Sequence, residues 1–123
     1  EGEQLRRFKH VSGSTLIFES LNHQATFARR ALFDRHGGFN LAFRTSADYD
    51  WFLRVFRAGT RTLYLPRVIG RFLTGGAHRA DLPALVRERH ALRLQYISPA
   101  ALAFGLQIGR FRRRWRKLMG YAG

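Results

Sequence analysis

The chain has 123 residues, about the size of one average domain, and it contains no cysteine, which excludes disulfide bonds, thiolate metal sites and a cysteine nucleophile. Lys and Arg number 22 against 8 Asp and Glu, a formal net charge of +14. This excess predicts a polyanionic partner, such as nucleic acid, anionic lipid or a phosphorylated ligand.

The first part of the chain predicts short elements. Residues 1–13 are polar and indicate a loop or a linker, and residues 14–21 favour a short helix. The loose alternation over 22–28, with Thr and Phe, predicts a short strand or an extended entry into the next element. A helix is then expected to end near His36, because Gly37 suits the left-handed position that closes a helix.

Residues 46–58 have the strongest helical pattern in the chain. Ser46 can cap the start of this helix and Gly59 can close it. The apolar side chains recur at i, i+3, i+4 and i+7, the spacing of one helical face. They are Tyr49, Phe52, Leu53 and Phe56.

Two runs rich in β-forming residues follow, at 61–66 and 68–73, and they predict strands or extended segments separated by Pro66. Two helices are expected after them. The first begins around Asp81 and Pro83 and ends near Ile97, and the second begins at Ser98 and Pro99 and ends near Met119.

The stretch "TSADYDWFLRVFRAG", residues 45–59, places Asp48 and Asp50 two positions apart. On a strand such a pair shares one face and can chelate a cation, whereas on a helix the two side chains diverge by about 200°. Asp50 has an i, i+4 partner in Arg54, which predicts an ion pair. Asp48 borders the apolar face and lies near the positive end of the helix dipole, which suits a general base. The alternative is that it only bonds first-turn amides.

The order and spacing of several motifs resemble a known family. The stretches are "NHQATFARRALFDRHGGFNLAFRTSADYDWFLRVFRAG" and "YLPRVIGRFLTGG", within residues 22–79. They resemble the C-terminal half of the catalytic domain of bacterial family 2 glycosyltransferases of the polysaccharide-building kind. The resemblance implies an α/β fold, the C-terminal part of a GT-A domain, with short strands, the amphipathic helix at 46–58 and two C-terminal helices.

The resemblance also implies roles for individual residues. Such enzymes invert the anomeric centre in one displacement and need a base for the acceptor hydroxyl. That role falls on Asp48, with Ala47 where many relatives have Glu. The expected substrate-binding residues are His23, Gln24, Asp50 and Arg54. For His23 the alternative is a buried histidine bonded to backbone groups, and for Asp50 and Arg54 it is a structural pair. Trp51 either lines a sugar-binding surface or packs under a neighbouring element.

The resemblance further implies a nucleotide-sugar donor, a sugar or lipid-linked acceptor, and a divalent cation, Mg²⁺ or Mn²⁺. It places most metal ligands upstream of residue 1, with His78 as one candidate ligand in this chain. The expected organisation is a remnant linker at 1–21, the acceptor-side half at 22–79 and a helical basic extension at 80–123. The chain is then expected to be a fragment of a longer enzyme, inactive in transfer by itself.

The C-terminal segment predicts a basic amphipathic helix. Six positive charges occur in the eight residues from Arg110, while an apolar face continues through the run. The candidates for a membrane or anion surface are Arg110, Arg112, Arg113, Arg114, Trp115, Arg116 and Lys117, and the apolar face consists of Phe104, Ile108, Phe111, Trp115 and Leu118.

Two interpretations of this helix stay open. It lies on an anionic membrane, which would place a cytoplasmic protein at the inner face of the plasma membrane, or its apolar face packs on the domain. A third class, a small nucleic-acid-binding or membrane-binding module without catalysis, is the alternative to an enzyme. The sequence lacks a zinc, RNP or helix-turn-helix pattern, which disfavours nucleic acid. No run approaches the about 20 apolar residues that span a bilayer.

Overall fold

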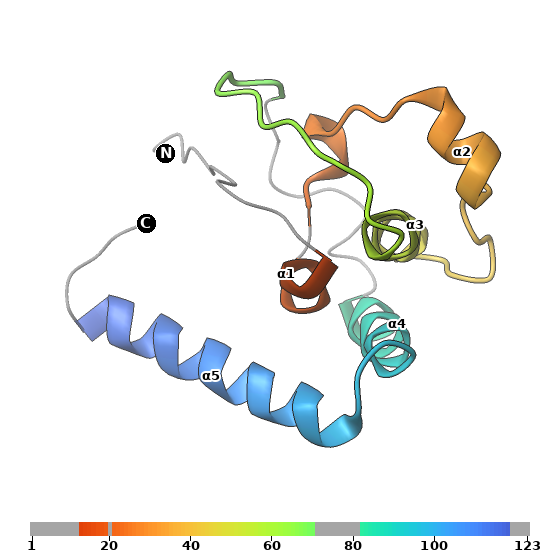
Figure 1. Cartoon of the computed structure of the whole chain (residues 1–123). Coiled ribbons are helices and arrows are strands. Elements are labelled where there is room, and N and C mark those ends of the chain that lie inside the picture. The colour runs from red at the N-terminus through yellow and green to blue at the C-terminus, as the bar shows by residue number, and fades with distance from the viewer. Residues whose placement is uncertain (1–12, 20, 71–81, 119–123) are drawn as a thin grey trace.

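The computed structural model describes residues 13–19, 21–70 and 82–118, without the side chains at 13, 14, 113, 116 and 117. This part of the chain forms five α-helices and one short 3-10 turn (Figure 1). They are α1 (Gly13–Phe18), η1 (His23–Ala25), α2 (Arg30–His36), α3 (Ala47–Arg57), α4 (Leu82–Leu94) and α5 (Pro99–Leu118).

The predicted α/β fold is wrong, because no β-strand occurs in the described residues. The run at 61–66 and the described part of 68–73 are irregular and largely exposed. A β-forming sequence becomes a strand only where a second strand satisfies its backbone groups. Neither run has such a neighbour among the described residues, so β propensity alone did not decide the structure. Residues 71–73 lie outside the described part.

Residues 22–28 form no strand, but the alternative of an extended entry into the next element holds at Thr26, whose φ of −125° and ψ of 123° are extended. The side chain of Asn22 accepts a hydrogen bond from the Gln24 amide at 3.0 Å and caps the 3-10 turn η1. Its backbone carbonyl accepts from the Thr26 hydroxyl at 2.9 Å. Asn favours such local side-chain bonds over a ladder, and here they tighten the chain into a turn.

Most helix boundaries follow the sequence prediction. Helix α2 ends at His36, where Gly37 has a φ of 76°, and Gly59 has a φ of 78° just after α3. Both values lie in the region that favours glycine. Helix α4 ends at Leu94 rather than Ile97, although the amide of Ile97 still bonds to the carbonyl of Arg93 at 3.1 Å. The Ser98 hydroxyl caps α5 by accepting from the Ala101 amide at 3.2 Å.

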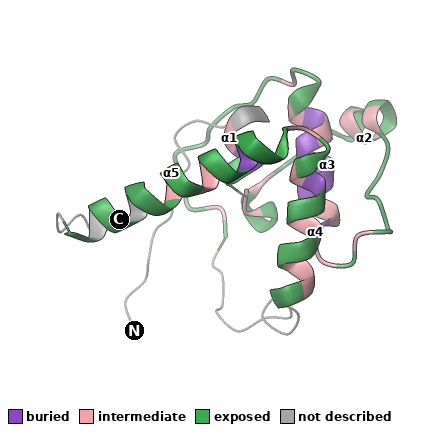
Figure 2. Cartoon of the chain, turned by 90° about the horizontal axis from the view of Figure 1, so that it is seen from below, coloured by how far each residue is buried: buried purple, intermediate pink, exposed green. Residues whose placement is uncertain are grey.

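Helix α3 lies at the centre of the core, between α1, α2 and α4 (Figure 1). Figure 2 shows the buried residues gathered in α3 and α1, whereas α5 is exposed along most of its length. Core side chains come from residues 1–21, 22–79 and 80–123 alike, so the three predicted segments share one core. The cluster consists of Leu16, Ile17, Tyr49, Trp51, Phe52, Leu53, Val55 and Leu92.

Candidate functional site

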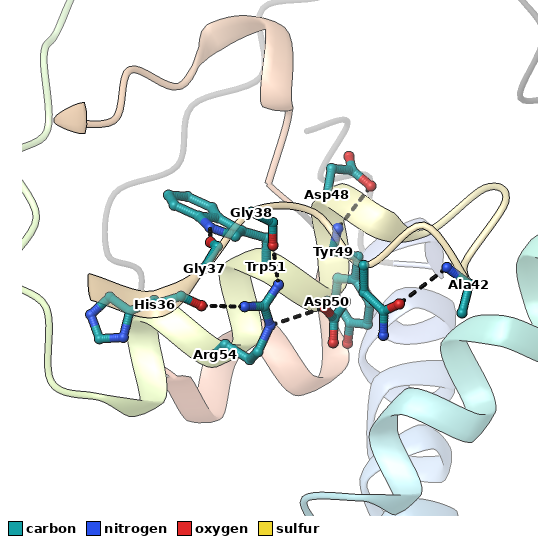
Figure 3. A network of polar contacts seen from close by, with 10 residues as sticks. His36, Gly37, Gly38, Ala42, Asp48, Tyr49, Asp50, Trp51 and Arg54 are labelled. Atoms are coloured by element: carbon teal, nitrogen blue, oxygen red, sulfur yellow. Dashed lines mark hydrogen bonds and ion pairs between the residues drawn. The ribbon is translucent and has the colours of Figure 1, made fainter. Parts of the chain in front are cut away.

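The two aspartates of α3 point to opposite sides of the helix (Figure 3). Asp50 is only 5% exposed, and its Oδ2 accepts from Arg54 Nε at 3.0 Å, so the predicted ion pair is confirmed. The other guanidinium nitrogens of Arg54 donate to the carbonyl of His36 and, at 2.7 Å, to that of Gly38. Asp50 therefore fixes Arg54, and Arg54 fixes the loop that follows α2.

Trp51 holds the same loop from a second direction. Its indole nitrogen donates to the carbonyl of Gly37 at 2.9 Å (Figure 3). Its ring stacks on Phe33 with centroids 4.2 Å apart and meets Phe39 edge to face at 6.1 Å. Trp51 is buried, so the interpretation that it packs under a neighbouring element is confirmed. The residues Asp50, Trp51 and Arg54 together bind the protein's own "HGGF" stretch at 36–39.

Asp48 lies on the other flank of α3, next to His23. Its Oδ2 lies 2.9 Å from His23 Nδ1, and its Oδ1 accepts from the Tyr49 amide at 2.8 Å. The Asp48 side chain is 26% exposed and that of His23 is 58% exposed. The alternative of a buried histidine is therefore wrong. The 3-10 turn, which replaced the predicted strand, carries His23 at its first position and places it beside the first turn of α3.

Arg89 of α4 completes this group, which we call the Asp48 site and define as His23, Asp48 and Arg89. The Arg89 guanidinium lies 5.3 Å from the centre of the Tyr49 ring. Burial lowers the pKa of Arg89, and attraction to the Asp48 carboxylate opposes that change. Arg89 therefore attracts the Asp48 carboxylate electrostatically from a second helix. Arg93 follows one turn later, and its Nε donates to the Tyr49 hydroxyl oxygen at 3.3 Å.

Glu88 ties α4 to the segment that precedes α3. Its carboxylate accepts from the amides of Arg44 and Thr45, both at 2.9 Å, and from the Thr45 hydroxyl at 2.7 Å. Burial raises the pKa of Glu88, but the hydrogen bonds from Thr45 and Arg44 outweigh burial and lower the pKa below its usual 4.5. This contact sets the position of the start of α3, and with it Asp48.

Sequence reasoning missed both Glu88 and Arg89. Glu88 had one signal, since it is the only acid between positions 82 and 97. This signal was weak, because Glu is by type mostly solvent-exposed. The partners of Glu88 lie 43 and 44 positions away, and no spacing rule connects them.

The remaining predicted residues are placed as follows. Gln24 is exposed on η1, and its backbone carbonyl lies close to Gly70, where an added Cβ would be 3.4 Å away. His78 lies outside the described residues, as do the side chains of Arg113, Arg116 and Lys117. The exposed side chains of Arg110, Arg112, Arg114 and Trp115 lie on α5 and do not belong to the Asp48 site.

The described residues do not form a metal centre. They contain no group of three or more His, Asp or Glu side chains suited to an ion. Asp48 and Asp50 bind different partners on opposite flanks of α3, so they are not a chelating pair. The divalent cation that the resemblance implies, with most of its ligands upstream of residue 1, stays a prediction. A hollow of 270 Å³ lies between α4 and α5, and of the predicted site residues only Arg110 lines it.

No family model, no curated protein and no solved structure matches this chain. In the described part of the chain, no helix is long and apolar enough to cross a membrane.

Proposed function

We propose that residues 22–79 contribute the acceptor side of an inverting glycosyltransferase, with Asp48 as the general base toward an acceptor hydroxyl. The observation that supports this function best is the 2.9 Å contact between His23 Nδ1 and Asp48 Oδ2. The two residues are 25 positions apart (48 minus 23) and belong to different motifs of the family resemblance. An acid oriented by an imidazole at an accessible helix start is suited to proton abstraction.

The surroundings of Asp48 explain how it would act. The His23 imidazole and the Tyr49 amide each hold one carboxylate oxygen, which orients the group and leaves a lone pair on each oxygen. The positive end of α3 and the Arg89 guanidinium both stabilise negative charge there. The side chain is one quarter exposed, so a hydroxyl in solution can reach it.

The proposed reaction is a single displacement. The acceptor hydroxyl gives its proton to the Asp48 carboxylate, and its oxygen forms a bond to the anomeric carbon of the donor. The bond between that carbon and the diphosphate oxygen breaks, and the electron pair leaves with the nucleoside diphosphate. The donor is a nucleotide sugar, and the acceptor is a sugar or lipid-linked sugar in polysaccharide or glycolipid synthesis.

The donor site and its Mg²⁺ or Mn²⁺ ion belong, in this proposal, to another part of a longer protein. Apolar side chains around 61–70 are exposed and offer a surface on which such a part can pack. They are Leu63, Tyr64, Leu65 and Val68. The proposal gives the described residues no role in binding this ion. We place the reaction in the cytoplasm, a reducing compartment that suits a sequence without cysteine.

The test is Asp48→Asn in the natural protein that contains this segment, with sugar transfer and donor binding measured separately. Transfer is expected to fall by about 10² to 10⁴, the usual contribution of a general base. Donor binding should change little. Asp34→Asn, which removes an exposed acid from α2, is the matched control. Full transfer by the Asp48 variant would exclude the proposed role.

A further inference from the structure

Helix α5 has two apolar faces on opposite sides. The inner face packs on the body of the protein, where Leu102 is fully buried and Gly105 lies against the Phe18 ring. The outer face is exposed to solvent, and its side chains have exposed fractions between 43% and 82%. At about 100° per residue these side chains fall within about 80° of arc. They are Phe104, Ile108, Phe111, Trp115 and Leu118.

Arginines flank this outer face along its second half. Arg112 and Arg114 are exposed and lie about 80° to either side of its centre line. Phe111 and Trp115 stack on each other, with ring centroids 6.1 Å apart, and form a continuous aromatic surface between the two arginines. Figures 1 and 2 show that this half of α5 extends away from the helices of the core.

We propose that the outer face of α5 binds the surface of an anionic phospholipid membrane, with the helix lying parallel to it. The five apolar side chains enter the region between headgroups and acyl chains, and Arg112 and Arg114 pair with lipid phosphates on both sides. Trp115 lies at the depth that tryptophan prefers at membrane interfaces. Six positive charges in residues 110–117 provide the complementary field.

Other occupants of this face fit less well. A polynucleotide would pair with the arginines but leave the apolar side chains in water. A second copy of the chain would cover the apolar face but bring the flanking arginines of both copies together at the interface. An anionic membrane satisfies both features of the surface at once. The inference is independent of the glycosyltransferase proposal, since it uses no residue of the Asp48 site.

Vesicle co-sedimentation of the whole chain tests the proposal. Binding is expected to vesicles of phosphatidylcholine with phosphatidylglycerol and not to phosphatidylcholine alone. Phe111→Ser with Trp115→Ser should weaken vesicle binding at least tenfold. A tenfold loss corresponds to roughly the free energy gained when one aromatic side chain is buried. Arg112→Gln with Arg114→Gln should weaken it by about fivefold for each charge, and high salt should reproduce that effect.

Matched variants control for charge and apolarity as such. Phe27→Ser with Leu41→Ser removes two exposed apolar side chains outside α5, and Arg61→Gln with Arg67→Gln removes two exposed charges outside α5. Both should leave vesicle binding within about twofold. Tryptophan emission should shift to the blue on binding, and this shift should vanish in Trp115→Ser, because Trp51 is already buried.

Three results would overturn the proposal. The first is equal vesicle binding by the α5 variants and the unmodified chain. The second is a preference for DNA over anionic vesicles that persists in Phe111→Ser with Trp115→Ser. The third is a dimer in sedimentation analysis that the same double variant converts to a monomer while the unmodified chain ignores vesicles.

Discussion

Helices α3 and α5 are both amphipathic by sequence, yet the structure uses them in opposite ways. Six of the eleven residues of α3 are buried, whereas in α5 only Leu102 is buried among the described side chains. The pattern of an amphipathic helix thus predicts an apolar face but not what covers it. In α3 the apolar face forms the core, and in α5 the larger apolar face is exposed to solvent.

Truncating one apolar side chain in each helix should give the largest difference in the free energy of unfolding. Leu53 of α3 is fully buried, so Leu53→Ala is expected to lower the free energy of unfolding by about 3 kcal/mol. Phe111 of α5 is 65% exposed, and Phe111→Ala should change it by no more than about 0.5 kcal/mol. Urea denaturation followed by circular dichroism measures both. Equal losses would mean that the face of α5 is covered in solution.

The next effect concerns the polar flank of α3. Asp50→Asn is expected to cost about 2 kcal/mol, less than a fully buried ion pair because Arg54 is 30% exposed. The arginine keeps its bonds to the carbonyls of His36 and Gly38 but loses its counter-charge. Arg54→Gln in the Asp50→Asn background should then cost less than Arg54→Gln alone. Additive losses in urea denaturation would show that the pair is not coupled.

How far the sequence predicted these features depends on the range of the contacts. The Asp50–Arg54 pair, Gly37 and Gly59 follow from local spacing and backbone preference, and all three predictions are confirmed. Of the two alternatives for 22–28 and for 61–66, the strand is wrong, because a strand needs a neighbouring strand that its own sequence does not specify. The contact between Glu88 and Thr45 likewise joins residues far apart in the sequence, and no sequence pattern predicted it.

The candidate site shows the same limit. Helical spacing placed Asp48 at the border of the apolar face and away from Asp50, which the structure confirms. Spacing did not place His23 beside it, and only the family resemblance suggested that the two residues meet. The 3-10 turn that brings them together is closed by local bonds to Asn22, from the Gln24 amide to its side chain and from the Thr26 hydroxyl to its carbonyl.

Glu88→Gln tests the link between α4 and the start of α3. The variant should be less stable by about 1 kcal/mol at neutral pH, because a charged acceptor of partly exposed amides becomes neutral. The folded-state pKa of Glu88 lies below its usual 4.5, so its contribution is complete above that value and is lost as the pH falls through the folded-state pKa.

Urea denaturation from neutral to acidic pH should therefore show that the stabilities of Glu88→Gln and the unmodified chain become equal in acid. Glu19→Gln, which removes an exposed acid next to α1, is the control and should follow the unmodified chain at every pH. A constant gap between Glu88→Gln and the unmodified chain down to the lowest pH would contradict the assignment of the effect to the Glu88 charge.

The smallest effect lies where α5 meets the core, at Gly105. An added Cβ would lie 2.3 Å from the Phe18 ring, so Gly105→Ala forces that ring to move. Phe18 is 40% exposed and can turn toward solvent, which limits the loss. Alanine also gains up to about 1 kcal/mol over glycine inside a helix. The two terms oppose each other, and the net loss in urea denaturation should stay below about 1 kcal/mol.

Removing the Phe18 ring separates the steric cost of Gly105→Ala from its gain in helix propensity. In a Phe18→Ala background Gly105→Ala has only its helix propensity left, so it should stabilise the protein by up to about 1 kcal/mol. The reversal of sign would show that α5 needs glycine at this position for its inner face and not for flexibility. The same destabilisation in both backgrounds would mean that the inner face of α5 packs against something other than Phe18, and the contrast between its two faces would lose its basis.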